Sequence, residues 1–516
     1  MIKKSPQPFP RIQIDFSPQI PSLKKIKDKT KIDVRYCLIA PYAFVHIYWD
    51  SKIHEMVYEI EEPILDDDEK IIKDEIVTAM SEMINFDTLI KKNQETLLQH
   101  IDGRFKILLA ELAINLSYES YGKIYYYLCR DFIGFNETEP LLRDYFIEDI
   151  ECNGINSPVY VVHRIYRNLK TTLVFKDNDR LAGFVEKLAQ RCGKYVSYAS
   201  PILDGSLPDG SRVNATYTKD ISNKGPTFTI RKFTKTPWTP IQLLSFKTLS
   251  PEMLAYLWML VEHKMNLLIV GGTSSGKTTL LNAIAFFIAP EARVVSIEDT
   301  LELNLPRENW LPSVTRSSTG IEKAGDVDLF TLLRNSFRQN PDYVIVGEVR
   351  GKEAYVLFQG MASGHASIST MHADSVDTVI KRLETPPIEL SPTLLNTLDC
   401  VCIMTHAIVN KQETRKLKEI VEIVDVSQNG VAITNTPFVW NPSEDQFYFK
   451  SGSKIFEKIS KRYGMTREEL EFEFRRRVRL IYKLFINRVF EFEQMRAVID
   501  QYYKQPEEVL KKYGVK

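Results

Sequence analysis

The sequence has little of what marks secreted and membrane-spanning proteins. Its longest apolar runs, such as 254–261 and 283–289, are too short to cross a bilayer, and its first residues form no apolar signal segment. Its six cysteines include no C-x-x-C pair, which favours core thiols over a zinc site or a disulfide framework. Basic and acidic residues are equal at 67 each, so no basic field indicates a nucleic-acid partner. These absences predict a cytoplasmic protein.

A chain of 516 residues is longer than one hydrophobic core usually serves, so we expect several domains. Short apolar strands that alternate with helices in the second half predict a mostly parallel α/β sheet covered on both faces. The predicted parts are a basic, proline-containing arm (1–35), a mainly helical domain (36–138), an α+β middle domain (139–233), a linker (234–240), an α/β nucleotide-binding domain (241–440) and a helical C-terminal region (441–516).

The two ends of the chain each leave an alternative open. We expect the arm over 1–35 to be extended and partly disordered, either as a solvated tail or as a segment that docks on a partner or on an acidic lipid surface. Near the other end, arginines cluster at 475–477 and 479. A helical bundle with a solvated basic edge is favoured there over a helix dedicated to docking a partner.

The most informative stretch is 266–279, which reads N-L-L-I-V-G-G-T-S-S-G-K-T-T. It places the pattern G-x-x-x-x-G-K-[ST] between a predicted buried strand and a predicted helix. Backbone N–H groups of such a loop surround a polyphosphate, its lysine binds the β and γ phosphates, and its hydroxyl ligates Mg²⁺. A glycine turn with no ligand is the alternative. The pattern predicts ATP/ADP and Mg²⁺ at Gly271, Gly272, Thr273, Ser274, Ser275, Gly276, Lys277, Thr278 and Thr279.

Polar residues follow three further predicted strands, where a doubly wound sheet binds its ligands. Glu348 directly follows the strand 343–347 and is a candidate for holding magnesium. The stretch 294–302 supplies carboxylates at Glu298, at position 299 and at Glu302, one of which would orient the attacking water in hydrolysis. His372 ends the run G-H-A-S-I-S-T-M-H and is a candidate γ-phosphate sensor, although a lone histidine is more often structural.

Together, G-G-T-S-S-G-K-T-T, I-E-D-T-L-E, V-G-E-V-R and S-G-H-A-S-I-S-T-M-H resemble the Walker A, Asp box, Walker B and His box of the secretion ATPase superfamily. That superfamily comprises the motors of type II secretion, type IV pili and type IV secretion. The motifs fill 266–372, and the upstream segments P-D-G-S-R and T-I-R-K-F extend the resemblance to roughly 140–410.

The resemblance implies a RecA-like P-loop fold assembled as a homohexamer. It implies that Glu302 is the catalytic glutamate, that Glu348 is the Walker B acid and that His372 lies near the γ phosphate. Glu298 opens the same acidic box. Arg212 and Arg231 match the arginines of the N-terminal part that reach the nucleotide of a neighbouring subunit, although either arginine alone would most often be a surface charge.

Two departures from the bacterial pattern point to the archaeal branch: a threonine at 300 where bacterial members usually have proline, and no four-cysteine zinc insertion. Length and the helical first domain are most similar to the archaellum motor ATPases. The resemblance implies a motor at the cytoplasmic face of the membrane that works with a polytopic platform protein and other cytoplasmic components. The alternatives are an archaeal pilus or secretion ATPase, a nucleic-acid translocase or helicase, and a scaffold that binds ATP without hydrolysing it.

Overall fold

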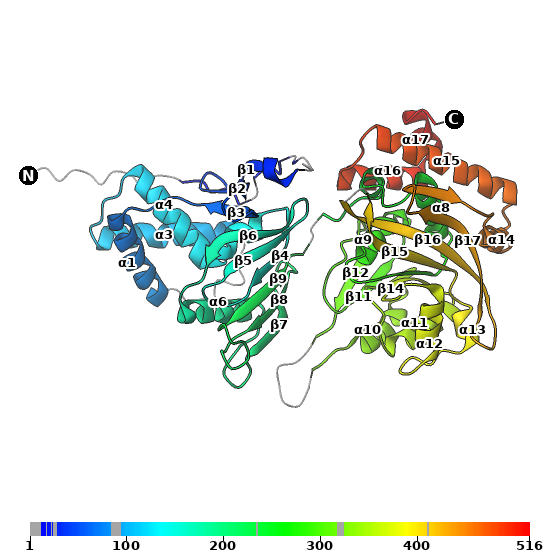
Figure 1. Cartoon of the computed structure of the whole chain (residues 1–516), viewed down its shortest axis with the longest axis horizontal. Coiled ribbons are helices and arrows are strands. Elements are labelled where there is room, and N and C mark those ends of the chain that lie inside the picture. The colour runs from blue at the N-terminus through cyan, green and yellow to red at the C-terminus, as the bar shows by residue number, and fades with distance from the viewer. Residues whose placement is uncertain are drawn as a thin grey trace, which may run out of the picture. The chain divides into compact units, whose positions relative to one another are not determined.

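The structure is a computed structural model that describes residues 12–16, 18–21, 23, 28–83, 94–233, 236–316, 325–409 and 412–515. It divides into two compact units, 1–233 and 234–516 (Figure 1). The division falls at the first residue of the expected linker, 234–240. Of the expected N-terminal arm, residues 1–11, 17, 22 and 24–27 lie outside the described residues. In the described part of the chain, no helix is both long enough and apolar enough to cross a membrane.

The first unit is built on one nine-stranded sheet. Its strands, in spatial order, are β1 (Asp33–Ile39), β2 (Ala43–Asp50), β3 (Glu55–Glu61), β6 (Arg167–Val174), β5 (Pro158–His163), β4 (Ile147–Cys152), β9 (Thr227–Arg231), β8 (Arg212–Thr216) and β7 (Ile202–Ser206). Its α-helices are α1 (Asp67–Met83), α3 (Gln94–Glu111), α4 (Tyr118–Leu128), α5 (Glu139–Arg143) and α6 (Asn178–Arg191).

This sheet joins the segments that we expected as separate domains over 36–138 and 139–233. β3 pairs in parallel with β6, with Val57 opposite Lys170, and the apolar residues of both segments form one core. The stretch 141–153, expected as a helix and a loop, contains β4. A register shift between Ile147 and Asp149 interrupts the alternation of buried and exposed residues in β4, which hides the period of two that identifies a strand.

The second unit holds the expected α/β fold. Its sheet runs β12 (Trp310–Val314), β11 (Val294–Glu298), β13 (Tyr343–Val346), β14 (Ala366–Met371), β10 (Leu267–Gly271), β15 (Cys400–Val409), β16 (Gln412–Val426), β17 (Ala432–Asn441) and β18 (Gln446–Phe449). The pairings from β12 to β15 are parallel, and those from β15 to β18 are antiparallel. A mostly parallel sheet of this kind confirms the predicted fold class.

Helices cover both faces of this sheet, so its central strands are buried on both sides. The helices of the α/β part are α7 (Pro240–Ser245), α8 (Pro251–Glu262), α9 (Lys277–Ile284), α10 (Leu329–Ser336), α11 (Glu353–Ala362), α12 (Val376–Glu384) and α13 (Pro392–Leu395). In β10, Leu267 and Ile269 join the core that contains α8 and α9, whereas Leu268 and Val270 join the core that contains α11 and α12. This double burial explains the unbroken apolar run of the strand.

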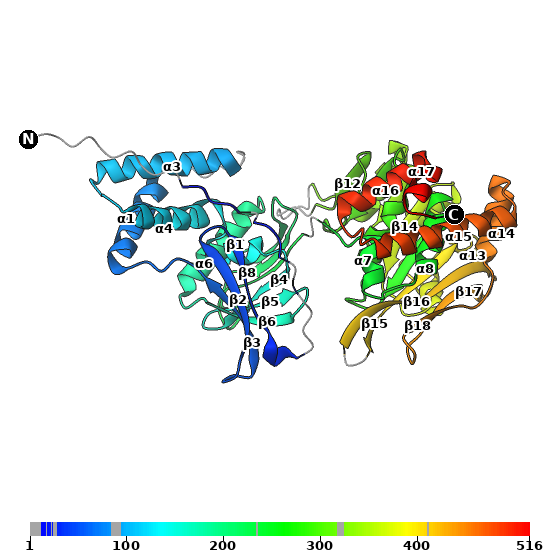
Figure 2. The ribbon, with the colours of Figure 1, turned by 90° about the horizontal axis from the view of Figure 1, so that it is seen from above.

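The C-terminal region contributes four helices to the core on the α8 side. They are α14 (Lys454–Tyr463), α15 (Arg467–Ile486), α16 (Phe492–Lys504) and α17 (Pro506–Lys512). Figure 2 shows α15 and α16 on the same side of the unit as α8. The antiparallel strands continue to Phe449, past the expected domain boundary at 441, and the helices begin at Lys454.

The basic cluster of α15, which we expected as a solvated edge, is partly buried. Arg477 is 3% exposed, forms ion pairs with Glu262 and Glu473, and lies 4.7 Å over the ring of Trp258. Burial acts to lower the pKa of Arg477, but the two carboxylates outweigh it and raise the pKa. Arg477 therefore fixes α15 against α8.

A buried carboxylate attaches the C-terminal helices to the sheet. Glu422 of β16 is fully buried, and it accepts hydrogen bonds from the hydroxyl of Tyr256 in α8 and from Ser453, which precedes α14. It also accepts from Asn435 Nδ2 at 2.6 Å and from the backbone N–H of Lys454 at 2.8 Å. One side chain thus satisfies donors from three elements.

Replacing this carboxylate tests its role. We expect Glu422→Ala to lower the free energy of unfolding by about 3 kcal/mol or more, because several buried donors lose their acceptor. Denaturant unfolding measures the change. Glu413→Ala is the control, because Glu413 lies on the same strand with 55% of its side chain exposed. Equal, small effects of the two changes would contradict this account of Glu422.

Candidate functional site

The candidate residues meet at one edge of the second sheet. β11, β13, β14 and β10 are neighbours in that order and run in parallel, so their carboxyl ends lie side by side. Glu298 ends β11, Glu348 follows β13, His372 follows β14 and the glycine loop follows β10. Residues that are far apart in the sequence are therefore brought to the place where sheets of this class bind their ligands.

The glycine loop has a geometry that larger residues would not allow. A Cβ atom on Gly271 would lie 2.5 Å from the carbonyl oxygen of Met404 and 2.5 Å from Ser275 Oγ. Gly276 has a φ of +93° and caps α9, so a side chain there would be strained. Ser275 Oγ donates to the Gly272 carbonyl at 2.8 Å. The loop is thus closed tightly enough to surround a phosphate group with its backbone.

The other loop residues are placed for contact with a ligand. Thr273 and Ser274 are exposed, and Thr278 and Thr279 lie half-buried in the first turn of α9, whose N-terminus favours an anion. Arg415 of β16 donates from Nε to the Ser274 carbonyl at 2.9 Å. No sequence pattern identifies Arg415, because its contact with the loop depends on how β16 packs.

Lys277 is buried in the loop. Its Nζ donates to the carbonyl oxygens of Gly271 at 3.2 Å and Gly272 at 3.0 Å, and it lies 3.4 Å from His372 Nδ1. Burial lowers the pKa of Lys277, while the nearby Glu348 and Glu302 oppose that effect. The ammonium is held by neutral acceptors that an anionic phosphate oxygen can replace.

His372 connects Lys277 to Glu348. His372 Nε2 lies 3.2 Å from Glu348 Oε1, on the opposite side of the ring from Lys277. A neutral ring that donates from Nε2 and accepts at Nδ1 satisfies both contacts. Burial lowers the pKa of His372, Lys277 lowers it further and Glu348 opposes them, which favours this neutral form at physiological pH.

Glu348 is held as a carboxylate at the end of this chain of contacts. Arg350 binds it with two hydrogen bonds, from Nε at 2.8 Å and from Nη2 at 2.7 Å. Burial alone would raise the pKa of Glu348, but Arg350, His372 and Lys277 together lower it. An ionised carboxylate beside Lys277 fits the magnesium role that the sequence predicts for Glu348. Arg350 stands within the V-G-E-V-R motif, but its hold on Glu348 was not predicted from the sequence.

Glu298 shapes the turn that carries Glu302. It is 2% exposed, and its Oε1 accepts from the backbone N–H groups of Glu302 at 2.9 Å and Leu303 at 3.0 Å. Asn282 of α9 holds the same turn, donating to the Glu302 carbonyl at 3.4 Å and accepting from the N–H of Asn304 at 3.0 Å. The Glu302 side chain is exposed, as a group that meets substrate must be.

Arg212 and Arg231 belong to the first unit. β8 and β9 place them directly opposite each other. Their side chains are 46% and 65% exposed and form ion pairs with Asp204 at 3.2 Å and Asp149 at 3.1 Å. The sequence predicted the two arginines from separate segments, and the structure shows them as one exposed pair.

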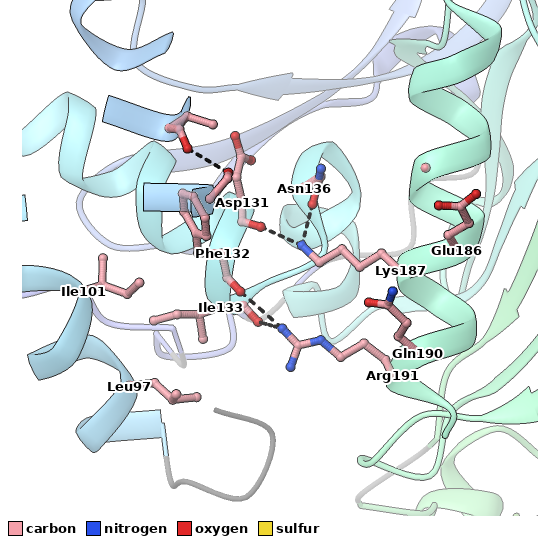
Figure 3. A pocket seen from close by; sticks show the side chains of 13 residues that line it. Leu97, Ile101, Asp131, Phe132, Ile133, Asn136, Glu186, Lys187, Gln190 and Arg191 are labelled. Atoms are coloured by element: carbon pink, nitrogen blue, oxygen red, sulfur yellow. Dashed lines mark hydrogen bonds between the residues drawn. The ribbon is translucent and has the colours of Figure 1, made fainter. Parts of the chain in front are cut away.

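The first unit also contains a cavity of about 340 Å³, which none of the predicted site residues lines (Figure 3). Its cations are Lys187 and Arg191 of α6. Lys187 donates to the carbonyl of Asp131 and to Asn136, and Arg191 donates to the carbonyls of Phe132 and Ile133. These contacts cap the end of the π-helix over 129–133, so we give both cations a structural role.

Residues 139–436 match the family described as type II/IV secretion system protein. The chain belongs to this family. One relative, an uncharacterised protein of Methanocaldococcus jannaschii, is 39% identical to this chain over 405 residues. The match covers 77% of this chain and 72% of the relative. The conjugal transfer protein TrbB of Rhizobium radiobacter is 30% identical over 235 residues, or 44% of this chain and 70% of TrbB.

One solved ATPase structure is similar to this chain over most of its own length. The DotB ATPase of Legionella pneumophila is 18% identical, with a TM-score of 0.40, and the match covers 69% of this chain and 92% of DotB. Because this TM-score is low, the family assignment rests on the sequence matches.

The buried Glu298 generates a pH prediction. Burial raises the pKa of Glu298 from 4.5 to about 7. The folded chain therefore binds a proton that the unfolded chain has released, and the stability from this proton is present below pH 4.5 and lost as pH rises through 7. We expect the free energy of unfolding of Glu298→Gln, relative to wild type, to rise by about 2 kcal/mol from pH 5 to pH 8.

Denaturant unfolding across this pH range measures the difference. Glu308→Gln is the control, because the Glu308 side chain is 91% exposed. A difference between Glu298→Gln and wild type that stays constant with pH would contradict the raised pKa.

Proposed function

We propose that this chain is an ATP-hydrolysing motor that works as a homohexamer and powers assembly and rotation of the archaellum. The contact chain Lys277–His372–Glu348 beside the glycine loop carries this proposal. Through a neutral histidine it joins a phosphate-binding cation to an ionised carboxylate, and these two charged groups suit binding of a nucleoside triphosphate and its magnesium ion.

The residues at the sheet edge have distinct parts in the proposed reaction. The loop N–H groups and Lys277 bind the phosphates, and Glu302 orients the attacking water. Thr278 and Glu348 would hold Mg²⁺, which neutralises charge on the β and γ phosphates when it is bound. Once Lys277 binds phosphate, His372 can also turn toward the γ phosphate.

Arg212 and Arg231 would complete the site of a neighbouring subunit. Exposed ion pairs such as those with Asp204 and Asp149 contribute only about 0.2–1 kcal/mol. The arginines can therefore leave these carboxylates for a phosphate group at little cost. Loss of the γ phosphate would release them, and the unit that carries them would move about the linker 234–240.

The archaellum assignment rests on the resemblance and on the 39% identical relative from an archaeon. It implies a motor at the cytoplasmic face of the membrane, with a polytopic platform protein and other motor components as partners. Assembly of an archaeal pilus or secretion system is the alternative within the family. A nucleic-acid translocase is the alternative from another class, and the equal numbers of acidic and basic residues disfavour it.

Steady-state hydrolysis tests the proposal directly. We expect the wild-type chain to hydrolyse ATP with Mg²⁺ in the absence of DNA, and Arg231→Ala to lower the rate by about three to five orders of magnitude while ATP affinity is retained. Arg180→Ala is the control, because Arg180 is an exposed arginine of the same unit that pairs with Glu137. Normal hydrolysis in Arg231→Ala would contradict the role of this arginine, and strong stimulation by single-stranded DNA would favour the translocase.

A further inference from the structure

A cavity of about 370 Å³ lies directly beside the proposed catalytic residues. Its walls include Glu348, Arg350, His372, Arg382 and Thr385. Glu348 and His372 thus line this cavity and also belong to the contact chain that reaches Lys277. These two side chains therefore lie between the cavity and Lys277, which binds the γ phosphate in the proposed site.

The charges of the cavity suit an anion. Glu348 is paired with Arg350, so Arg382 supplies the excess positive charge. Arg382 donates from Nη1 to the carbonyl of His372. Within the described part of the chain, these contacts use two donors of Arg350 and one of Arg382, whereas each guanidinium group has five. Both arginines are exposed and can offer further donors to a phosphate, whose geometry a guanidinium group matches.

We propose that this cavity is the exit site for inorganic phosphate. Phosphate leaves the γ position past Glu348 and His372, binds Arg350 and Arg382, and then reaches solvent. No bond changes in this step, because hydrolysis has already occurred. The proposal rests on the proposed ATPase function and adds a binding site for one of its products.

Arg350 would couple this exit to the state of Glu348. When phosphate enters the cavity, Arg350 can contact it with its remaining donors, so one guanidinium group is shared between the phosphate and Glu348 until the phosphate leaves. Occupancy of the cavity would therefore weaken the hold of Arg350 on Glu348 until the product has gone. Arg382 also anchors the backbone of His372, so the test must separate binding of phosphate from this structural contact.

Thr385 allows that separation. It is exposed at the C-terminal end of α12 and lines the cavity, and its hydroxyl donates to the carbonyl of Lys381 at 2.9 Å. Thr385→Glu adds a negative charge to the cavity and leaves Arg382 in place. Thr385→Gln removes the same hydroxyl and introduces a side chain of nearly the same size as glutamate, but without the charge.

The experiment compares ATP cleavage by quenched flow with phosphate release by a fluorescent phosphate sensor, in a single turnover of the full chain. We expect Thr385→Glu to release phosphate about tenfold more slowly than wild type, because its carboxylate repels the product, while cleavage keeps its rate. Thr385→Gln should release phosphate at the wild-type rate. Added inorganic phosphate should also inhibit Thr385→Glu less than it inhibits Thr385→Gln.

Arg382 provides a second, independent pair of variants. Arg382→Ala should slow release, and Arg382→Lys, which keeps the charge, should restore most of the rate. Wild-type release in both Thr385→Glu and Arg382→Ala would overturn the exit site, as would equal slowing of cleavage and release. Absence of cleavage in the wild-type chain would instead contradict the proposed function itself, so the two failures are distinguishable.

Discussion

A buried ammonium group determines the arrangement of this site. Lys277 has left water, and its charge is tolerable only because oxygen and nitrogen acceptors surround it. Those acceptors are the carbonyls of Gly271 and Gly272 and the ring of His372, which come from two neighbouring strands. The tight loop after β10 and the position of His372 after β14 together supply these acceptors.

The same constraint explains why the contacts form a chain. A neutral His372 can accept from Lys277 only if its other nitrogen donates, and Glu348 takes that hydrogen bond. Glu348 remains ionised because Arg350 binds both of its carboxylate oxygens. Each group therefore fixes the protonation or orientation of the next. A triphosphate that replaces the loop carbonyls at Lys277 would disturb every contact in this series. In the proposed mechanism, nucleotide binding at Lys277 thereby alters the contacts of Arg350.

The sequence predicted those parts of the structure whose signals are local. The run 266–279 contains a complete strand, loop and helix start, and the structure has these elements within a few residues of their expected bounds. The contributions of Asn282, Arg350 and Arg415 depend on packing between distant segments, so no local pattern revealed them. Arg477 is similar, because in the sequence it is one of several adjacent arginines. Its burial depends on the rings of Trp258 in α8 and Tyr502 in α16, and on the ion pair with Glu262.

The single sheet of the first unit could not be predicted from local sequence signals for the same reason. β3 and β6 are separated by more than a hundred residues, and their pairing joins two segments of different composition into one sheet. The register of Arg212 and Arg231 likewise depends on which strands are neighbours. The pairing of β8 with β9 aligns the two arginines, which we propose contact the nucleotide of an adjacent subunit.

The central claim is that one subunit binds the phosphates through Lys277 and another completes the site with Arg231. Mixing the inactive variants Lys277→Ala and Arg231→Ala tests it most directly, with subunit exchange verified by labelled chains. An Arg231→Ala subunit keeps its loop and a Lys277→Ala neighbour keeps its arginine, so the account predicts that mixed rings regain ATPase activity. If no activity returned at any ratio although the subunits had exchanged, the claim of a shared site would be contradicted.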